Sequence, residues 1–268
     1  MDKDLRPYVA ELIGTFALVF LSAGAVCANY LTFGRSEQAV LSLPGIALAA
    51  GLALAVALTA TMNVSGGYLN PAVTLMLYVF KKIDGIKASW LIGVQLLGAA
   101  LAGLFLKALF HDELYRYGVP HVNLPAFNTP ILTAGVMMSG GGIELVLTFI
   151  LVFAIFGTVF DPRAPKLGGV LVGLALAAVV LMGYNLTGGS ANPARCFGTY
   201  LWETSSQQGH FREHVFVYWL GPMVGALLAG GVYTWLILPV PEEEKKHAAP
   251  AAVPAGVSAG AGLAKAKK

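Results

Sequence analysis

Charged side chains are scarce in this sequence: Asp, Glu, Lys and Arg together make up 12% of its 268 residues. A soluble globular domain carries about twice that fraction. Hydrophobic residues make up 57% of the chain, and the mean hydropathy is +0.71. The composition therefore excludes an ordinary soluble protein and indicates one that lies mostly within a membrane.

Cysteine is also rare. The chain has two cysteines, Cys27 and Cys196, and neither belongs to a motif with the spacing of a metal site. Two cysteines cannot form a disulfide framework, so we interpret both as small apolar packing residues. We expect neither a metal nor a cofactor.

Two further classes of protein lack support. The net charge is +3, and the basic residues are spread over loops and the C-terminal tail, without a basic patch interleaved with aromatic residues. Nucleic acid is therefore not an expected partner. The sequence also offers no activated nucleophile and no acid–base pair, so we do not expect an enzyme.

Long apolar runs dominate what remains, and each is close to the length that a bilayer requires. The first is too long for the core of a signal peptide and has no clear cleavage site, so we interpret it as a spanning helix. The sequence predicts an all-α integral membrane protein with six spans, at about residues 8–30, 43–62, 88–110, 142–160, 166–185 and 215–238.

A Gly-rich loop that ends in Asn-Pro-Ala occurs twice, at residues 65–74 and 187–196. Asn is a good N-cap and Pro suits the first helical position, so each motif predicts the start of a short helix. A single Asn-Pro pair is a common turn. Two copies in corresponding places are much more specific. The motif residues are Asn70, Pro71, Ala72, Asn192, Pro193 and Ala194.

The rest of the chain repeats in the same way. Residues 10–16 resemble residues 143–149, and residues 98–103 resemble residues 225–230. Each half holds three spans and one short helix, and an odd number of spans makes the second half an inverted repeat. The two short helices would then point at each other. Because a helix that starts inside a bilayer exposes free N–H groups, the pair predicts a shared polar cavity.

The distribution of Lys and Arg predicts the orientation. Twelve of these residues lie on the side shared by both termini, and five lie on the other. The termini are therefore expected in the cytoplasm. We expect the four histidines of the opposite loops to be surface residues, at positions His111, His121, His210 and His214.

These motifs resemble those of the aquaporin, or major intrinsic protein, family over residues 10–230. The resemblance implies six tilted spans and two re-entrant half-helices around one pore per subunit, in a homotetramer. It also implies that Glu11 and Glu144 are structural buried carboxylates that bind loop N–H groups. The channel domain would cover residues 8–238, as repeats 8–110 and 142–238 joined by loop 111–141. Residues 1–7 would be a cytoplasmic N-terminus and residues 239–268 a disordered cytoplasmic tail.

Matching outward from the two motifs places the selectivity filter of the family on Ala50, Val180, Gly189 and Arg195. Strict water channels of the family carry Phe and His where this chain has Ala50 and Val180, so the resemblance implies a wider opening. The set is most similar to that of plant nodulin-type proteins, which pass boric acid, glycerol and urea. Tyr68 replaces the His usual before the first motif, and would narrow or gate the cytoplasmic side.

The expected function is a passive channel for water and small uncharged solutes that excludes protons and ions, placed in the plasma membrane. A strict water channel is the main alternative. A secondary transporter is also built from inverted repeats and broken helices, but such proteins need an ion-coordinating site at the midplane. A non-conducting junctional protein is a further alternative, and the intact Asn70, Asn192 and Arg195 argue against it.

Overall fold

The computed structural model describes residues 4–36, 41–123, 134–165, 167–204 and 210–238, and every regular element within these ranges is a helix. Six of the described helices are long and apolar enough to cross a membrane, as predicted. They are α1 (Arg6–Ser36), α2 (Leu43–Thr61), α4 (Gly85–Leu109), α6 (Ala134–Ile155) with η3 (Phe156–Phe160), α7 (Gly168–Thr187), and η4 (Phe216–Leu220) with α10 (Gly221–Val232) and η5 (Tyr233–Ile237).

Two shorter helices, α3 (Pro71–Val79) and α8 (Pro193–Tyr200), begin at the Asn-Pro-Ala motifs. The connection between the two halves contains α5 (Asp112–Tyr115) and η1 (Arg116–Gly118), and α9 (His210–Val215) precedes the last long helix. The predicted tail, residues 239–268, lies outside the described part of the chain, as do residues 124–133 of the predicted loop.

The helix bounds differ from the predicted spans at both ends: α1 continues to Ser36, past the predicted residue 30. α6 begins eight residues before the predicted residue 142 and runs through Gly140, Gly141 and Gly142. These glycines do not end the helix, because the last long helix packs closely there: a Cβ on Gly221 would lie 2.6 Å from the carbonyl oxygen of Gly141. The predicted charged turn before residue 88 starts α4, where Asp84 accepts a hydrogen bond from the Lys87 amide at 2.9 Å.

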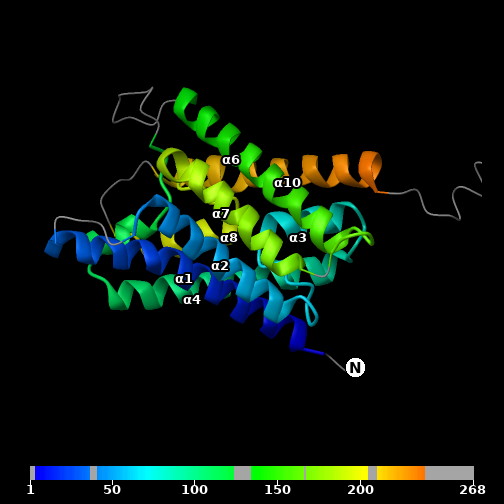
Figure 1. The fold of residues 1–268 in the computed structure, drawn as a ribbon, viewed down its shortest axis with the longest axis horizontal. Helices are drawn as coiled ribbons and strands as arrows, with labels where there is room; N and C mark the ends of the chain where they lie inside the picture. The colour runs from blue at the N-terminus through cyan, green and yellow to red at the C-terminus, as the bar shows by residue number, and fades with distance from the viewer. Residues whose placement is uncertain (1–3, 37–40, 124–133, 166, 205–209, 239–268) are drawn as a thin grey trace, which may run out of the picture.

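The two halves of the chain pack around a central pair of helices, α2 and α7, which come from different repeats. Their backbones approach closely because glycines face each other. A Cβ on Gly51 would lie 2.5 Å from the carbonyl oxygen of Gly173, and the reverse distance is also 2.5 Å. α1 packs on α4, and α6 packs on α10, on the two sides of this pair (Figure 1).

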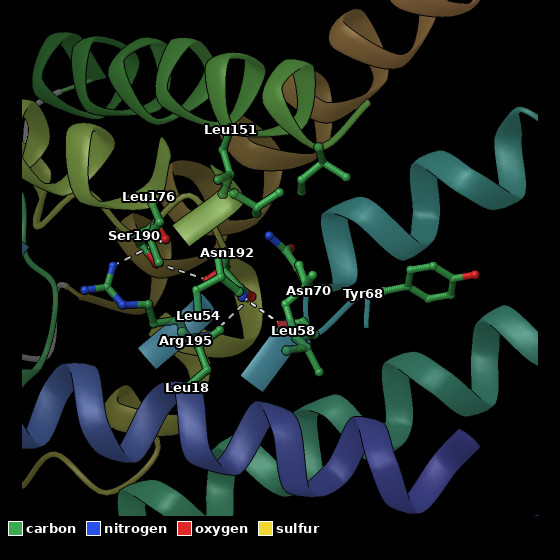
Figure 2. Close-up of a pocket in the computed structure, with 13 residues that line it drawn as sticks. Leu18, Leu54, Leu58, Tyr68, Asn70, Leu151, Leu176, Ser190, Asn192 and Arg195 are labelled. Carbon is green, nitrogen blue, oxygen red and sulfur yellow. Dashed lines mark hydrogen bonds between the residues drawn. The ribbon is translucent and has the colours of Figure 1, made fainter. Parts of the chain in front are cut away.

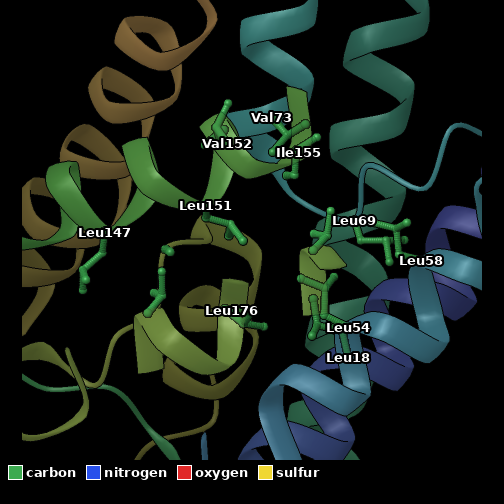
Figure 3. Packing of buried hydrophobic residues seen from close by; sticks show 14 of the residues in the cluster. Leu18, Leu54, Leu58, Leu69, Val73, Leu147, Leu151, Val152, Ile155 and Leu176 are labelled. Carbon is green, nitrogen blue, oxygen red and sulfur yellow. The ribbon is translucent and has the colours of Figure 1, made fainter. Parts of the chain in front are cut away.

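The short helices tie the two halves together. α3 belongs to the first half but packs on α10 as well as on α4, and α8 belongs to the second half and packs on α4 (Figure 1). Because each short helix packs on a long helix of the other half, the N-termini of α3 and α8 come together in the interior. The apolar core surrounds this meeting point, with leucines from α1, α2, α6 and α7 facing one another (Figure 3).

Candidate functional site

The loop before α3 is shaped by a buried carboxylate. Glu11 on α1 is fully buried, and its Oε1 accepts hydrogen bonds from the Ser65 hydroxyl at 2.7 Å and the Tyr68 amide at 2.8 Å. Its Oε2 accepts from the Leu69 amide and from Gln95 Nε2, each at 2.7 Å. Because Glu11 binds the backbone amides of both Tyr68 and Leu69, it holds the loop in one conformation.

Glu144 on α6 does the same for the second loop. Its Oε1 accepts from the Thr187 hydroxyl at 2.6 Å and the Ser190 amide at 2.9 Å, and its Oε2 accepts from the Ala191 amide at 2.7 Å. The same acceptor therefore serves the same loop in both repeats, although the two loops lie more than one hundred residues apart. The donors to the two carboxylates are backbone amides, the Ser65 and Thr187 hydroxyls and the Gln95 amide, and the structural role of both residues stays a prediction.

Both loops end in a strained residue. Leu69 has φ +51° and Ala191 has φ +49°, and such values are unusual for residues other than glycine. This conformation turns each carbonyl oxygen towards the opposite repeat. There Asn192 Nδ2 donates to the carbonyl of Leu69, and Asn70 Nδ2 donates to the carbonyl of Ala191, each at 2.9 Å. The strain is held by the surrounding hydrogen bonds, as is typical of functional sites.

The same asparagines cap the short helices. Asn70 Oδ1 accepts from the Ala72 amide at 2.9 Å, and Asn192 Oδ1 accepts from the amides of Ala194 at 2.9 Å and Arg195 at 3.3 Å. Pro71 and Pro193 occupy the first helical positions, as predicted. A carboxamide has two N–H groups, and only one is used across the repeats. Each asparagine keeps one N–H for a molecule in the cavity.

The two asparagines lie at the middle of a narrow cavity (Figure 2). About 10 Å³ of it is open to the centre of a water molecule, which is about one water sphere. One end has Arg195 and the other has Tyr68. The remaining lining is mostly aliphatic, from Leu18, Leu54, Leu58, Leu151, Ile155, Val172 and Leu176. The polar side chains on the lining belong to Asn70, Asn192, Arg195, Ser190 and Tyr68.

Arg195 is 6% exposed and lies on the first turn of α8. Its Nη1 donates to the carbonyl of Gly189 at 2.8 Å, and its Nε donates to the Ser22 hydroxyl at 3.3 Å. Among the described residues no carboxylate forms an ion pair with it. Arg195 also lines a second, wider cavity of about 210 Å³, the outer cavity, at the end of the narrow cavity away from Tyr68. The guanidinium therefore stands between the two cavities with N–H groups to spare.

Residues 2–233 match the sequence model of a known family, the major intrinsic protein family. The chain belongs to the major intrinsic protein family. Its relatives include Aquaporin TIP4-4 of Zea mays, which is 39% identical over 237 residues, 87% of each chain. Aquaporin AqpM of Methanothermobacter thermautotrophicus is 35% identical over 241 residues, 85% of this chain and 96% of its own.

A solved structure supports the fold. The aquaglyceroporin from Plasmodium falciparum superposes with a TM-score of 0.71 over 87% of this chain and 96% of its own, at 23% identity. Major intrinsic proteins are channels, so this chain is an integral, multi-pass channel protein and not an enzyme. Neither TIP4-4 nor AqpM is nodulin-type by name, and the likeness of the filter to that subgroup stays a prediction.

The four filter positions expected in a major intrinsic protein lie on the outer side of the asparagines. Gly189 contacts Arg195, and a Cβ on Gly189 would lie 3.1 Å from the Cα of Val180, so these three residues adjoin one another. Ala50 lies one helical turn outward from Leu54 on α2. Ala50 and Val180 are 1% and 0% exposed and belong to one apolar cluster, and neither lines the narrow or the wider cavity.

Tyr68 lies at the end of the narrow cavity opposite Arg195 (Figure 2). Its ring folds back over Gly66, where φ is +106° and the missing Cβ leaves the room that the ring occupies. Any other residue at position 66 would displace the ring. The placement fits the predicted narrowing of that side.

One expectation about the outer loops is wrong. His214 is not a surface residue but is 5% exposed, with its Nδ1 3.4 Å from Cys196 Sγ and its ring stacked on Tyr200. It is buried because α9, which carries it, packs against α8. His111 is exposed and His121 is partly exposed, while the side chain of His210 lies outside the described part.

The sequence reasoning also missed two polar residues of the site. Gln95 donates to Glu11 and, at 2.9 Å, to the Thr74 hydroxyl, and Ser22 accepts from Arg195. Gln95 carries a usable signal, because an uncharged polar residue in a membrane span is costly unless it has a partner. Ser22 carries one as well, since it lies four residues after the cavity residue Leu18 and so on the same face of α1.

Proposed function

We propose that this protein is a passive channel for water and small uncharged solutes such as glycerol, urea and boric acid, and that it excludes protons and ions. The observation that carries the proposal is the meeting of Asn70 and Asn192 on one narrow cavity, each with one amide N–H to spare. Such donors suit the oxygen atom of a neutral solute.

The same arrangement opposes cations. The N-termini of α3 and α8 each carry about half a positive elementary charge, and both face the cavity. Arg195 adds a full charge at the outer end, without a carboxylate partner in the described residues. A cation there loses much of its hydration shell and meets a repulsive field. Two asparagines that both donate also interrupt a chain of waters that could relay a proton.

The range of solutes follows from the filter. Ala50, Val180 and Gly189 are all small, so no bulky ring occupies these positions, and the side formed by Ala50 and Val180 is apolar. Hydroxyl and amide groups of a solute would bind Arg195, while its carbon face would lie against Ala50 and Val180. This division suits glycerol and urea better than a filter lined with polar rings.

A strict water channel is the second candidate. It is favoured by the small volume of the inner cavity, about 10 Å³, and by the burial of Ala50 and Val180 away from both cavities. A filter closed around one water molecule would pass water in single file and reject wider solutes.

Stopped-flow light scattering on proteoliposomes separates the two candidates. Shrinkage under an impermeant osmolyte measures water flow, and re-swelling under inward gradients of glycerol, urea or boric acid measures solute flow. Protein-free liposomes and an Asn70→Ala, Asn192→Ala double variant are the controls. Fast water and solute flow supports the proposal, water flow alone supports the strict water channel, and no flow above the controls contradicts both.

We also propose that both termini lie in the cytoplasm, that the protein resides in the plasma membrane, and that four copies assemble, each with its own pore. The excess of Lys and Arg on the side of the termini supports the orientation. Protease protection of terminal tags in sealed cells tests the orientation, imaging of a tagged chain tests the membrane, and cross-linking in native membranes tests the number of copies.

A further inference from the structure

Two stripes of side chains, one on α7 and one on α1, run from the narrow cavity, which is the inner one, to the wider outer cavity. On α7, Val172 and Leu176 line the inner cavity, and Tyr184 lines the outer cavity, with Val180 between them. These residues are four apart, so they lie on one face of the helix. Four residues advance a helix by about 6 Å. Tyr184 therefore lies one turn outside the filter position Val180.

The stripe on α1 follows the same spacing. Leu18 lines the inner cavity, Ser22 binds Arg195, and Val26 and Tyr30 line the outer cavity. Tyr30 is thus two turns outside the level of Arg195. Side chains on a helix lean towards its N-terminus, and on both helices that direction points inward, towards the filter.

The two tyrosines meet above the filter. The phenol groups of Tyr30 and Tyr184 are in contact. Both rings pack against the apolar cluster that contains Ala50 and Val180. The two rings therefore cover the buried filter positions Ala50 and Val180 on the side away from the asparagines.

A third tyrosine holds this arrangement in place. Tyr117, in η1 of the connection between the repeats, stacks on Tyr30 with ring centroids 3.7 Å apart and planes 5° apart. Arg116 lies over the Tyr117 ring at 5.2 Å. A tyrosine that is stacked on one side and in contact with another phenol has little freedom to swing out of the path.

We propose that Tyr30 and Tyr184 set the upper size limit for solutes, one turn outside the filter, and that Tyr117 locks them. This inference rests on the proposed channel function and refines it. Water and small solutes pass the pair. Polyols longer than glycerol meet two rings that cannot part while Tyr117 stays stacked.

The test compares wild type with Tyr184→Ala, Tyr30→Ala and Tyr184→Phe in proteoliposomes. Influx of glycerol and of the four-carbon polyol erythritol is measured relative to water flow in the same preparation. The matched control is Leu181→Ala, on the exposed face of the same helix, where Leu181 is 48% exposed. Preserved water flow shows that each variant is folded.

We expect a several-fold rise in the erythritol-to-water ratio for Tyr184→Ala and Tyr30→Ala, and little change for Tyr184→Phe, which keeps its ring, or for Leu181→Ala. If wild type passes glycerol and neither alanine variant raises the erythritol ratio, the size limit lies elsewhere while the proposed function stands. If wild type rejects glycerol and Tyr184→Ala admits it, the role of the pair stands and the proposed solute range is wrong.

Discussion

The side-chain amide of Asn70 donates a hydrogen bond to the carbonyl oxygen of Ala191, 121 residues further along the chain, over 2.9 Å. The side-chain amide of Asn192 donates the equivalent hydrogen bond to the carbonyl oxygen of Leu69. Each motif is therefore completed by the other repeat, and neither half of the chain can form the centre of the cavity alone.

The first prediction concerns this pair of hydrogen bonds between the two repeats. Asn70→Ala removes an N-cap, which costs about 1 kcal/mol. It also leaves the buried carbonyl of Ala191 without its donor, for about 1–3 kcal/mol more. We expect a lower melting temperature in detergent and slower water flow in liposomes. The exposed Asn185→Ala is the control, and equal melting temperatures for the two variants would contradict the role of the bond.

A second prediction concerns the buried carboxylates. Glu144→Gln replaces one acceptor oxygen by an N–H donor, so either the Ala191 amide or the pair formed by Thr187 and Ser190 loses its acceptor. The expected loss is about 1–3 kcal/mol for each buried group left unbonded. Thermal unfolding and water flow measure it. Glu113→Gln, at an exposed position, should behave as wild type. A Glu144→Gln protein as stable as this control would show that the carboxylate is dispensable.

The third prediction concerns Arg195. Arg195→Val removes the buried charge and the hydrogen bonds to Gly189, Ser190 and Ser22. We expect faster passage of protons or cations and of larger neutral solutes, because both the repulsive charge and the bulk at this level are lost. An entrapped pH-sensitive dye follows protons, and light scattering follows solutes. The exposed Arg6→Ala, at a position that lines neither cavity, is the control for the loss of a positive charge. Unchanged selectivity would refute the assignment of Arg195 to the filter.

The fourth prediction concerns pH and the turn after η3. Arg163 Nη2 donates to Asp161 Oδ2 at 2.6 Å, and the Tyr233 hydroxyl donates to the same oxygen at 3.1 Å. The hydrogen bonds from Arg163 hold the pKa of Asp161 well below its usual range. Because the folded pKa is depressed, the stabilisation is complete above the unfolded pKa near 4 and is lost as pH falls below it.

Asp161→Asn should therefore lower the melting temperature at pH 7 and pH 5, and the difference from wild type should shrink as the pH falls below about 4. Melting curves across this range in detergent measure it. Asp4→Asn breaks an exposed ion pair with Arg6 and should change little. A difference that does not depend on pH would mean that the charge of Asp161 is not what stabilises this turn.

The sequence alone determined the helices, the two repeats and the caps of α3 and α8. These features depend on local chemistry: the length of an apolar run, the residue that starts a helix, and the spacing of similar segments. The buried positions of Glu11 and Glu144 followed from the family resemblance, and the structure supplies their hydrogen-bond donors.

Only the tertiary structure decided which distant residues meet. Ser22 reaches Arg195 across 173 positions, Tyr30 stacks on Tyr117 and contacts Tyr184, and His214 is buried against Cys196. These contacts depend on how closely the helices approach and on their relative rotation, which are set by packing between elements far apart in the chain. Hydropathy and motif spacing indicate which residues form a helix. They do not indicate which residues of another helix lie opposite it.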